Sequence, residues 1–202
     1  MSLARESTRG RPHSAATLLA GRRERAADTV LGAALLATGL NAGPFYAFDV
    51  GVMAGLQEAD DRTFVEAMQQ INRAIENPVF LASFLGAPVL TAVAVVQQRR
   101  LGSRAAATTR WVVGALGLSA AVFAVTVGAN VPLNDELTRA GDPDRIADLA
   151  AVRERFEDPW AAWNIVRTVA STAALLCLGR ALVLHGRSSP AGAMSPDADS
   201  RA

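Results

Sequence analysis

Four long apolar stretches dominate this sequence. They cover residues 29–56, 78–96, 111–130 and 160–182, close to or above the roughly 20 residues that an α-helix needs to cross a bilayer. The second and third stretches contain no charged residue. A soluble amphipathic helix would show a polar face with a period of 3.6 residues, which these stretches lack. The sequence therefore predicts an all-α fold, an integral membrane four-helix bundle.

The composition excludes several other classes of protein. Half of the 202 residues are hydrophobic, 19% are charged and the net charge is +1, so neither a disordered chain nor a partner of nucleic acid is expected. The single cysteine, Cys177, excludes a disulfide framework. The only histidines, His13 and His185, lie outside the apolar stretches, and intramembrane haem and copper sites usually use histidine ligands. We therefore expect no metal and no cofactor.

The arginines predict the orientation in the membrane. Six lie before the first stretch, and the link between the second and third stretches carries four arginines and no acid, whereas the other two loops are acidic on balance. The positive-inside rule then predicts a multi-pass protein of the cell membrane with both termini in the cytoplasm. The first stretch is too long for a cleaved signal peptide.

The two ends of the chain are rich in polar and small residues. Such segments bury too little apolar surface to become ordered. We expect residues 1–27 and 185–202 to form disordered cytoplasmic tails. Residues 28–184 would then form the membrane domain, in contact with the lipid bilayer.

The two acidic loops each contain an amphipathic pattern. In the first, apolar residues recur at helical spacing from Phe64 to Ile75, and in the second from Ile146 to Phe156. These patterns predict two short amphipathic helices on the extracytoplasmic side. They would either lie in the headgroup region or cover the mouth of the bundle as a lid. Asn77-Pro78 and Asp158-Pro159 are each expected to begin the span that follows.

Polar residues within the spans converge on the extracytoplasmic half of the bundle. Arg167 lies about 10 Å below the outer end of the fourth span, at a depth similar to that of Asp49. An arginine at this depth costs several kcal/mol unless it is paired or hydrated, which makes it a candidate functional residue with Asp49 as its expected partner. Other polar and aromatic residues at similar or somewhat greater depth are Asn41, Tyr46, Asn130, Trp160, Trp163 and Asn164.

Structural explanations for these residues remain open. Asp49 and Arg167 could form an ion pair that only fixes the helix register. Trp160 and Trp163 could be interfacial anchors, and Asn130 and Asn134 could be turn residues around Pro132.

Four segments of the chain resemble a known family. They cover residues 43–56, residues 64–72 followed by Asn77-Pro78, residues 130–134 and residues 160–168. In that order they resemble the anthrone oxygenase-like family of small four-span membrane proteins, over residues 28–182. Most bacterial members are filed as a domain of unknown function. Some fungal members oxidise anthrones to anthraquinones without a metal or flavin.

The resemblance implies a cofactor-free oxidoreductase, a monooxygenase that acts on an anthrone-like or other hydrophobic aromatic substrate. Such chemistry needs a base, a cation for the enolate oxygen and an apolar slot that excludes water. In this hypothesis Asp49 is the base, and Arg167 holds the oxygen together with Asn164 and Asn130. The walls and the remaining substrate contacts are assigned to Asn41, Phe45, Tyr46, Asn72, Asn134, Trp160 and Trp163.

Two other functions remain open. The protein could bind or transport a small hydrophobic molecule without chemistry, although four spans without an inverted repeat are few for a transporter. A homodimer would supply more spans. It could also be an accessory membrane subunit that supports a partner protein.

Overall fold

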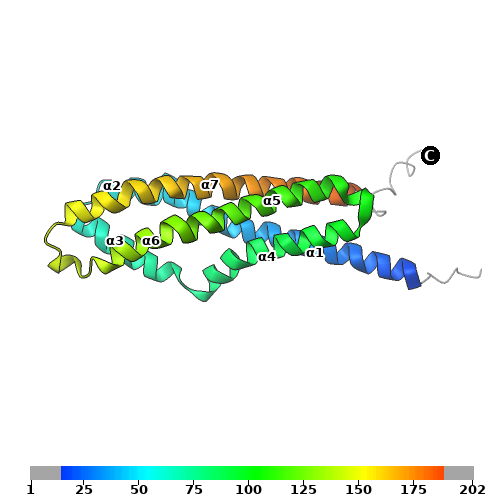
Figure 1. Ribbon diagram of the computed structural model, residues 1–202, viewed down its shortest axis with the longest axis horizontal. Helices are drawn as coiled ribbons and strands as arrows, with labels where there is room; N and C mark the ends of the chain where they lie inside the picture. The colour runs from blue at the N-terminus through cyan, green and yellow to red at the C-terminus, as the bar shows by residue number, and fades with distance from the viewer. Residues whose placement is uncertain (1–14, 189–202) are drawn as a thin grey trace, which may run out of the picture.

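The structure is a computed structural model that describes residues 15–188. These residues form four long helical segments packed side by side, and each segment is long and apolar enough to cross a membrane (Figure 1). The predicted all-helical bundle of four membrane-spanning helices is thereby confirmed.

Two of the four segments contain a π-helical turn. The first segment consists of α1 (Ala15–Ala47), the π turn η1 (Phe48–Val52) and α2 (Met53–Gln57). The third consists of the 3-10 turn η2 (Gly102–Ala105), α5 (Ala106–Val125), the π turn η3 (Thr126–Asn130) and α6 (Val131–Arg139).

The other two segments are uninterrupted helices. The second segment is α4 (Pro78–Arg100), and the fourth is α7 (Leu149–Ser188). As expected, Asn77 caps α4, because its side chain accepts hydrogen bonds from the backbone N–H groups of Val79 and Phe80, both at 3.0 Å.

The buried side of each long segment is narrow and contains many small or polar residues. On α7 the buried residues follow one another at intervals of three or four, which is the spacing of coiled-coil packing; they are Phe156, Trp160, Asn164, Arg167, Ser171, Ala174, Leu178, Ala181 and His185. Large apolar side chains such as Val89, Val113 and Val169 point outward instead. This distribution suits a bilayer, in which close packing and interhelical hydrogen bonds hold helices together.

The amphipathic helix α3 (Asp61–Ile75) packs onto the bundle and turns its apolar face inward. Phe64, Val65 and Met68 are fully buried against side chains of α6 and α7. Asp60 caps the helix by accepting a 3.0 Å bond from the backbone of Thr63. Hydrogen bonds from Thr63 lower the pKa of the Asp60 carboxyl from its ordinary value. The helix therefore covers the bundle and does not lie with its apolar face in lipid.

The second predicted amphipathic helix does not exist as a separate element. Residues 143–145 form the short 3-10 turn η4 (Pro143–Arg145), and the helical pattern that follows is the beginning of α7. Asp158-Pro159 does not start a new helix, because Pro159 lies inside α7. Phe156 and Trp160, on either side of this proline, are buried in one cluster with Phe64, and this packing keeps the helix continuous.

The expected tails are shorter than predicted. α1 is already helical at Ala15, and α7 continues to Ser188, so the expectation of disorder is wrong for residues 15–27 and 185–188. The rest of both predicted tails lies outside the described residues.

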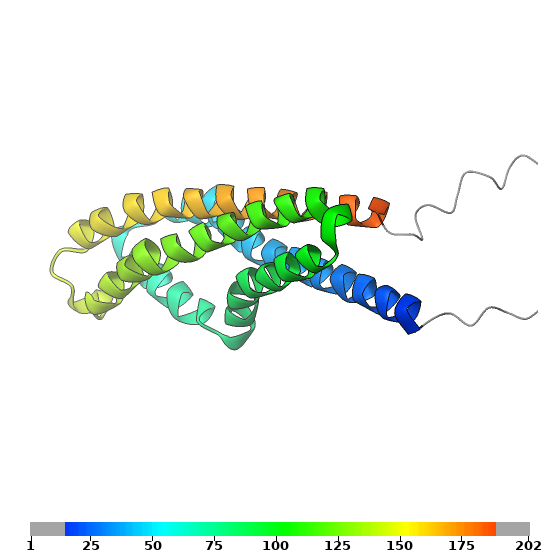
Figure 2. The same ribbon diagram turned by 45° about the vertical axis from the view of Figure 1, so that its right-hand side comes forward.

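The two ends of the bundle differ in charge, and Figures 1 and 2 show which elements meet at each end. The arginine-rich end holds the start of α1, the α4–α5 link and the end of α7, and the opposite, acidic end holds α3, η4 and the start of α7. The arginine ion pairs within residues 15–188 lie at the acidic end, and their arginines are Arg62, Arg139, Arg145, Arg153 and Arg155.

Candidate functional site

A cavity of about 360 Å³ lies in the half of the bundle nearer to the acidic end. Every long segment and α3 contribute to its wall. The aromatic part of the wall consists of Phe45, Phe48, Phe80, Phe84 and Trp160. The amide and cationic part consists of Asn72, Asn130, Asn134, Asn164 and Arg167. The volume and this mixture of side chains are typical of a small-molecule site.

Arg167 is the only basic residue among the described residues that line the cavity, and it is 7% exposed. Its Nη2 atom donates a 2.7 Å hydrogen bond to Oδ1 of Asn164. Its guanidinium carbon lies 4.4 Å from the ring centre of Phe45 and 5.4 Å from that of Trp160. Two aromatic faces and one amide therefore hold the cation, in an arrangement that stabilises a desolvated charge.

Asn164 connects Arg167 to Asp49. Asn164 is fully buried, and its Nδ2 atom donates to the backbone oxygen of Phe45 at 2.9 Å and to Oδ1 of Asp49 at 2.5 Å. The hydroxyl of Thr168 donates to the other oxygen of Asp49 at 2.5 Å. Both carboxylate oxygens of Asp49 thus already accept hydrogen bonds, and Asp49 does not line the cavity.

Asp49 and Arg167, which the sequence suggested as partners, do not form a direct ion pair. In the part of the chain that the structure describes, no carboxylate oxygen lies within 4.0 Å of an Arg167 nitrogen. The amide of Asn164 lies between the two charges because it can accept from one and donate to the other. Asp49 acts on Arg167 through this amide.

Asn130, Asn134 and Trp160 form a second hydrogen-bonded group in the cavity wall. Trp160 Nε1 donates to Oδ1 of Asn134 at 2.8 Å, and Nδ2 of Asn130 donates to the backbone oxygen of Trp160 at 3.3 Å. The two asparagines lie within one continuous helical segment, so their interpretation as turn residues is wrong. Trp160 is 4% exposed, which also excludes a role as an interfacial anchor.

Three buried polar atoms of the wall have no hydrogen-bond partner within residues 15–188. They are Nδ2 of Asn72, Oδ1 of Asn130 and Nε of Arg167. Buried polar groups in folded proteins are nearly always hydrogen-bonded, and an unpaired one costs about 1–3 kcal/mol. The wall therefore retains capacity for hydrogen bonds to a bound molecule.

Besides Asp49, three of the predicted site residues do not line the cavity: Asn41, Tyr46 and Trp163. Asn41 binds α1 to α4, because its Nδ2 atom donates to the backbone oxygen of Ser83 at 3.0 Å. Tyr46 and Trp163 are 56% and 43% exposed on the outer surface of the bundle. Each directly adjoins a buried site residue, Phe45 or Asn164, and successive residues of a helix point about 100° apart.

Several wall residues were missed in the sequence. Phe80 and Phe84 stack with their ring centres 5.9 Å apart and form the wall contributed by α4. The sequence did carry a signal for them, because two aromatic residues four positions apart after the Asn77 cap lie on the same face of the helix. Glu76 is the only carboxylate among the described wall residues, and it lies in the short exposed connection between α3 and α4.

Both π-helical turns lie next to the site. Phe48 of η1 and Asn130 of η3 line the cavity, and both turns contact α7. A π turn is wider than an α turn and changes the direction of the residues that follow it, and such turns recur at functional sites. Nothing in the sequence indicated them.

One part of the cavity wall is exposed on the outer surface of the bundle. Leu81 of α4, Val127 of η3 and Val131 of α6 line the cavity and are 42%, 52% and 40% exposed. All three side chains are apolar, and they belong to segments able to span the membrane. The cavity therefore borders the apolar outer surface of the bundle between α4 and the third segment.

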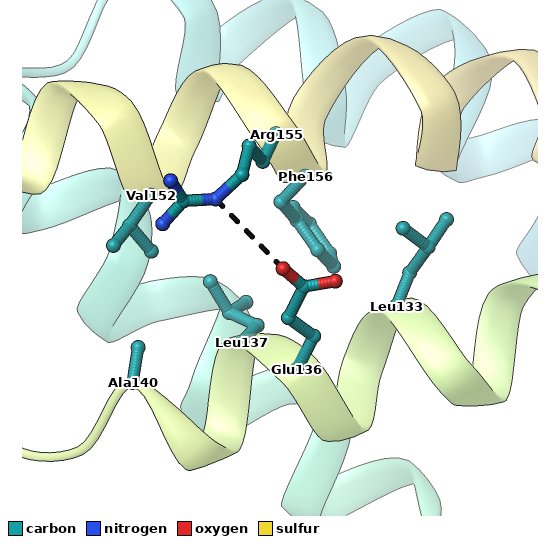
Figure 3. A pocket seen from close by; sticks show the side chains of 7 residues that line it. All are labelled: Leu133, Glu136, Leu137, Ala140, Val152, Arg155 and Phe156. Atoms are coloured by element: carbon teal, nitrogen blue, oxygen red, sulfur yellow. Dashed lines mark ion pairs between the residues drawn. The ribbon is translucent and has the colours of Figure 1, made fainter.

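A much smaller hollow lies between α6 and α7 (Figure 3). It measures about 20 Å³, and the side chains of Glu136 and Arg155 approach each other across it at 3.8 Å. This volume holds about one water molecule, so the hollow is no substrate site. Among the described residues, no three His, Cys, Asp or Glu side chains are grouped so that they could hold a metal ion.

Comparison with known proteins gives one match. Residues 79–177 match the family model described as anthrone oxygenase. The matched region includes α4 to most of α7, and with them Asn130, Asn164 and Arg167. No curated protein and no solved structure matches the chain.

Proposed function

Because the chain belongs to the anthrone oxygenase-like family through residues 79–177, we propose that its cavity binds a flat hydrophobic aromatic molecule, such as an anthrone, and oxygenates it without a cofactor. The observation that supports this most is the placement of one buried cation, Arg167, against an aromatic wall. This combination fits a flat molecule that carries one oxygen on which negative charge develops.

The proposed reaction balances with dioxygen as the only co-reactant. One anthrone and one dioxygen give one anthraquinone and one water. Loss of a proton from the ring CH₂ gives an aromatic enolate, which passes one electron to dioxygen. The resulting radicals combine to form a carbon–oxygen bond. The peroxide then takes up a proton and loses water, with its remaining C–H proton, to leave the new carbonyl.

The cavity supplies two of the groups that this reaction needs. Arg167 donates to the enolate oxygen, and the unpartnered atoms Nε of Arg167 and Nδ2 of Asn72 add hydrogen-bond donors to the wall. Phe45, Phe80 and Phe84 pack against the rings and keep water away. A dry site strengthens the interaction between the guanidinium and the enolate.

The proton acceptor that we propose is Glu76. It lines the cavity, whereas both oxygens of Asp49 are engaged by Asn164 and Thr168 behind the wall. Asp49 is therefore a positioning residue, which orients the Asn164 amide and through it the guanidinium of Arg167. This revises the role as base that the sequence suggested for Asp49.

The proposed function is tested by anthraquinone formation together with oxygen uptake. Detergent-purified protein is given a panel of anthrones, and the rate is compared with the spontaneous rate under the same conditions. We expect acceleration, with one dioxygen consumed for each anthraquinone. Tight binding of anthrones without acceleration would contradict the enzyme and favour a protein that binds or transports hydrophobic molecules.

A matched pair of variants distinguishes the roles of the Glu76 and Asp49 carboxylates. We expect Glu76→Gln to lower kcat by about 10²–10⁴-fold, as is typical for loss of a general base. Asp49→Asn keeps one oxygen that can accept from Asn164, and the Thr168 hydroxyl can rotate to accept from the new NH₂ group. We therefore expect this variant to retain at least about a tenth of the activity, a loss of no more than 1.4 kcal/mol. The measurement is kcat as a function of pH for both variants. The opposite order of effects would restore Asp49 as the base.

We further propose that the protein lies in the cell membrane with its arginine-rich end in the cytoplasm. The support is the charge difference between the two ends, together with the four apolar segments. Short loops rich in arginine are retained in the cytoplasm. Under this orientation the aromatic cavity lies in the extracytoplasmic half of the bilayer.

A further inference from the structure

A second cavity, of about 430 Å³, lies at the arginine-rich end of the bundle. It is formed where the start of α1, the α4–α5 link and the end of α7 meet. Its wall includes Arg23 of α1, Arg100 of α4, Arg104 of η2 and His185 of α7. Neither the oxygenase reaction nor the aromatic cavity involves these residues.

The three arginines carry positive charge that the described chain does not neutralise. All three are exposed, and none forms an ion pair with a described carboxylate. Glu24 is the only acidic residue in the described part of the wall. The cavity therefore has an excess of positive charge. A guanidinium presents a fork of N–H donors that matches the oxygens of a phosphate group.

His185 adds a buried polar side chain to the wall of this cavity. His185 is 4% exposed and lines the cavity, and its Nε2 atom has no hydrogen-bond partner among the described residues. Nε2 lies 3.2 Å from Oδ1 of Asp28, but the contact lacks hydrogen-bond geometry. On its other side, Nδ1 of His185 lies 3.4 Å from Nε2 of Gln98. The imidazole of His185 thus lies between Asp28 and Gln98 at this end of the bundle.

Apolar side chains of the same wall favour a lipid as the source of the phosphate. Leu19 lines the cavity and is 55% exposed, and Leu101 lies opposite on the α4–α5 link. Leu18, the neighbour of Leu19 in the sequence, is 58% exposed. Arginines and exposed leucines in adjacent positions are typical of a helix at the membrane surface, where the charged groups reach the headgroups. Basic pockets between membrane-spanning helices are suited to anionic headgroups.

We propose that this cavity binds the phosphate group of an anionic phospholipid, with Arg23, Arg100 and Arg104 as its ligands. The lipid would hold the start of α1 against the α4–α5 link and the end of α7. This site is independent of the aromatic cavity, so its test does not depend on oxygenase activity.

The test measures lipid binding by the full chain in a mild detergent. Native mass spectrometry gives the Kd for phosphatidylglycerol, for phosphatidylcholine and for inorganic phosphate. The pocket variant is Arg100→Gln/Arg104→Gln. Its control is Arg99→Gln/Arg110→Gln, which removes the same charge from the same end at residues that do not line the cavity. Arg23→Gln tests the contribution of α1. Circular dichroism checks that each variant keeps its helices.

We expect wild-type protein to prefer phosphatidylglycerol over phosphatidylcholine. The pocket variant should bind phosphatidylglycerol about tenfold or more weakly, because it loses two charge-assisted hydrogen-bonding groups. Arg23→Gln should weaken binding too, and the control should change the Kd less than about twofold. Equal losses in the control and pocket variants, or no preference for the anionic lipid, would overturn the site. Equally tight binding of inorganic phosphate would overturn the lipid as its source.

Discussion

Arg167→Ala is expected to lower kcat/KM for an anthrone by about 10²–10³-fold, which is the usual effect of removing one preorganised oxyanion donor. Arg167 is the only cation in the described wall of the aromatic cavity, so no other positive charge there can stabilise the enolate. Arg167→Lys should recover only part of the loss, because an ammonium lacks the planar fork that binds Asn164 and lies over Phe45. The measurement is anthraquinone formation at subsaturating substrate.

Trp163→Phe is the control for this variant. Trp163 lies one helical turn before Arg167 and is 43% exposed on the outer surface, so its replacement should leave kcat/KM within about twofold of wild type. The proposed role of Arg167 is wrong if Arg167→Ala and Trp163→Phe show the same activity. An effect of Trp163→Phe alone would mean that the substrate site lies on the outer face of α7.

Asn164→Leu is expected to destabilise the protein by about 3–5 kcal/mol, the range seen when a buried charged network loses one member. The change removes the hydrogen bonds of Asn164 to Asp49, to Arg167 and to the backbone of Phe45 at once. Leucine has the same number of side-chain heavy atoms with the same branching and leaves no cavity, so the loss mainly reports the unpaired polar groups that remain. The measurement is the free energy of unfolding in mixed micelles with increasing denaturing detergent.

Ile165→Ala provides the comparison for stability. Ile165 adjoins Asn164 in the chain but is 54% exposed on the outer surface of the bundle. We expect its replacement to change the free energy of unfolding by less than about 1 kcal/mol. If Asn164→Leu is no more harmful than Ile165→Ala, the bridge between Asp49 and Arg167 contributes nothing to the fold.

The architecture was predictable because the length of an apolar stretch is a strong signal in a membrane protein. The absence of charge over residues 78–96 and 111–130 was sufficient to predict two of the spans. The relative depth of each polar residue along its span was also predictable, because it depends only on counting residues along a helix. Counting brought Arg167, Asn164 and Asn130 together, and the structure places all three at one cavity.

The direction in which side chains point around each helix was harder to predict. Phe45 is buried and Tyr46 exposed, although the two aromatic residues are adjacent. In lipid the apolar side chains face outward, so the usual periodicity of a soluble helix is missing. The polar or small residues Asn164, Arg167 and Ser171 do mark the buried side at intervals of three and four. Following that series would have placed Trp163 on the outside.

The connections at the acidic end could not be deduced from local signals. A proline after a capping residue starts α4 at Pro78 but lies inside α7 at Pro159. The difference comes from the packing of Phe156 and Trp160 with Phe64, which is distant in the sequence. The bridge from Asp49 through Asn164 to Arg167 was hidden for a similar reason, because the π turn η1 alters the direction of the chain at Asp49.

The apolar border formed by Leu81, Val127 and Val131 changes how substrate affinity must be expressed. A molecule that reaches the cavity from the hydrocarbon first dissolves in the bilayer, so the concentration that the protein experiences is a mole fraction in lipid. The KM calculated from total volume would then rise in proportion to the amount of lipid added at constant protein. Only the KM in moles of substrate per mole of lipid would stay constant between preparations.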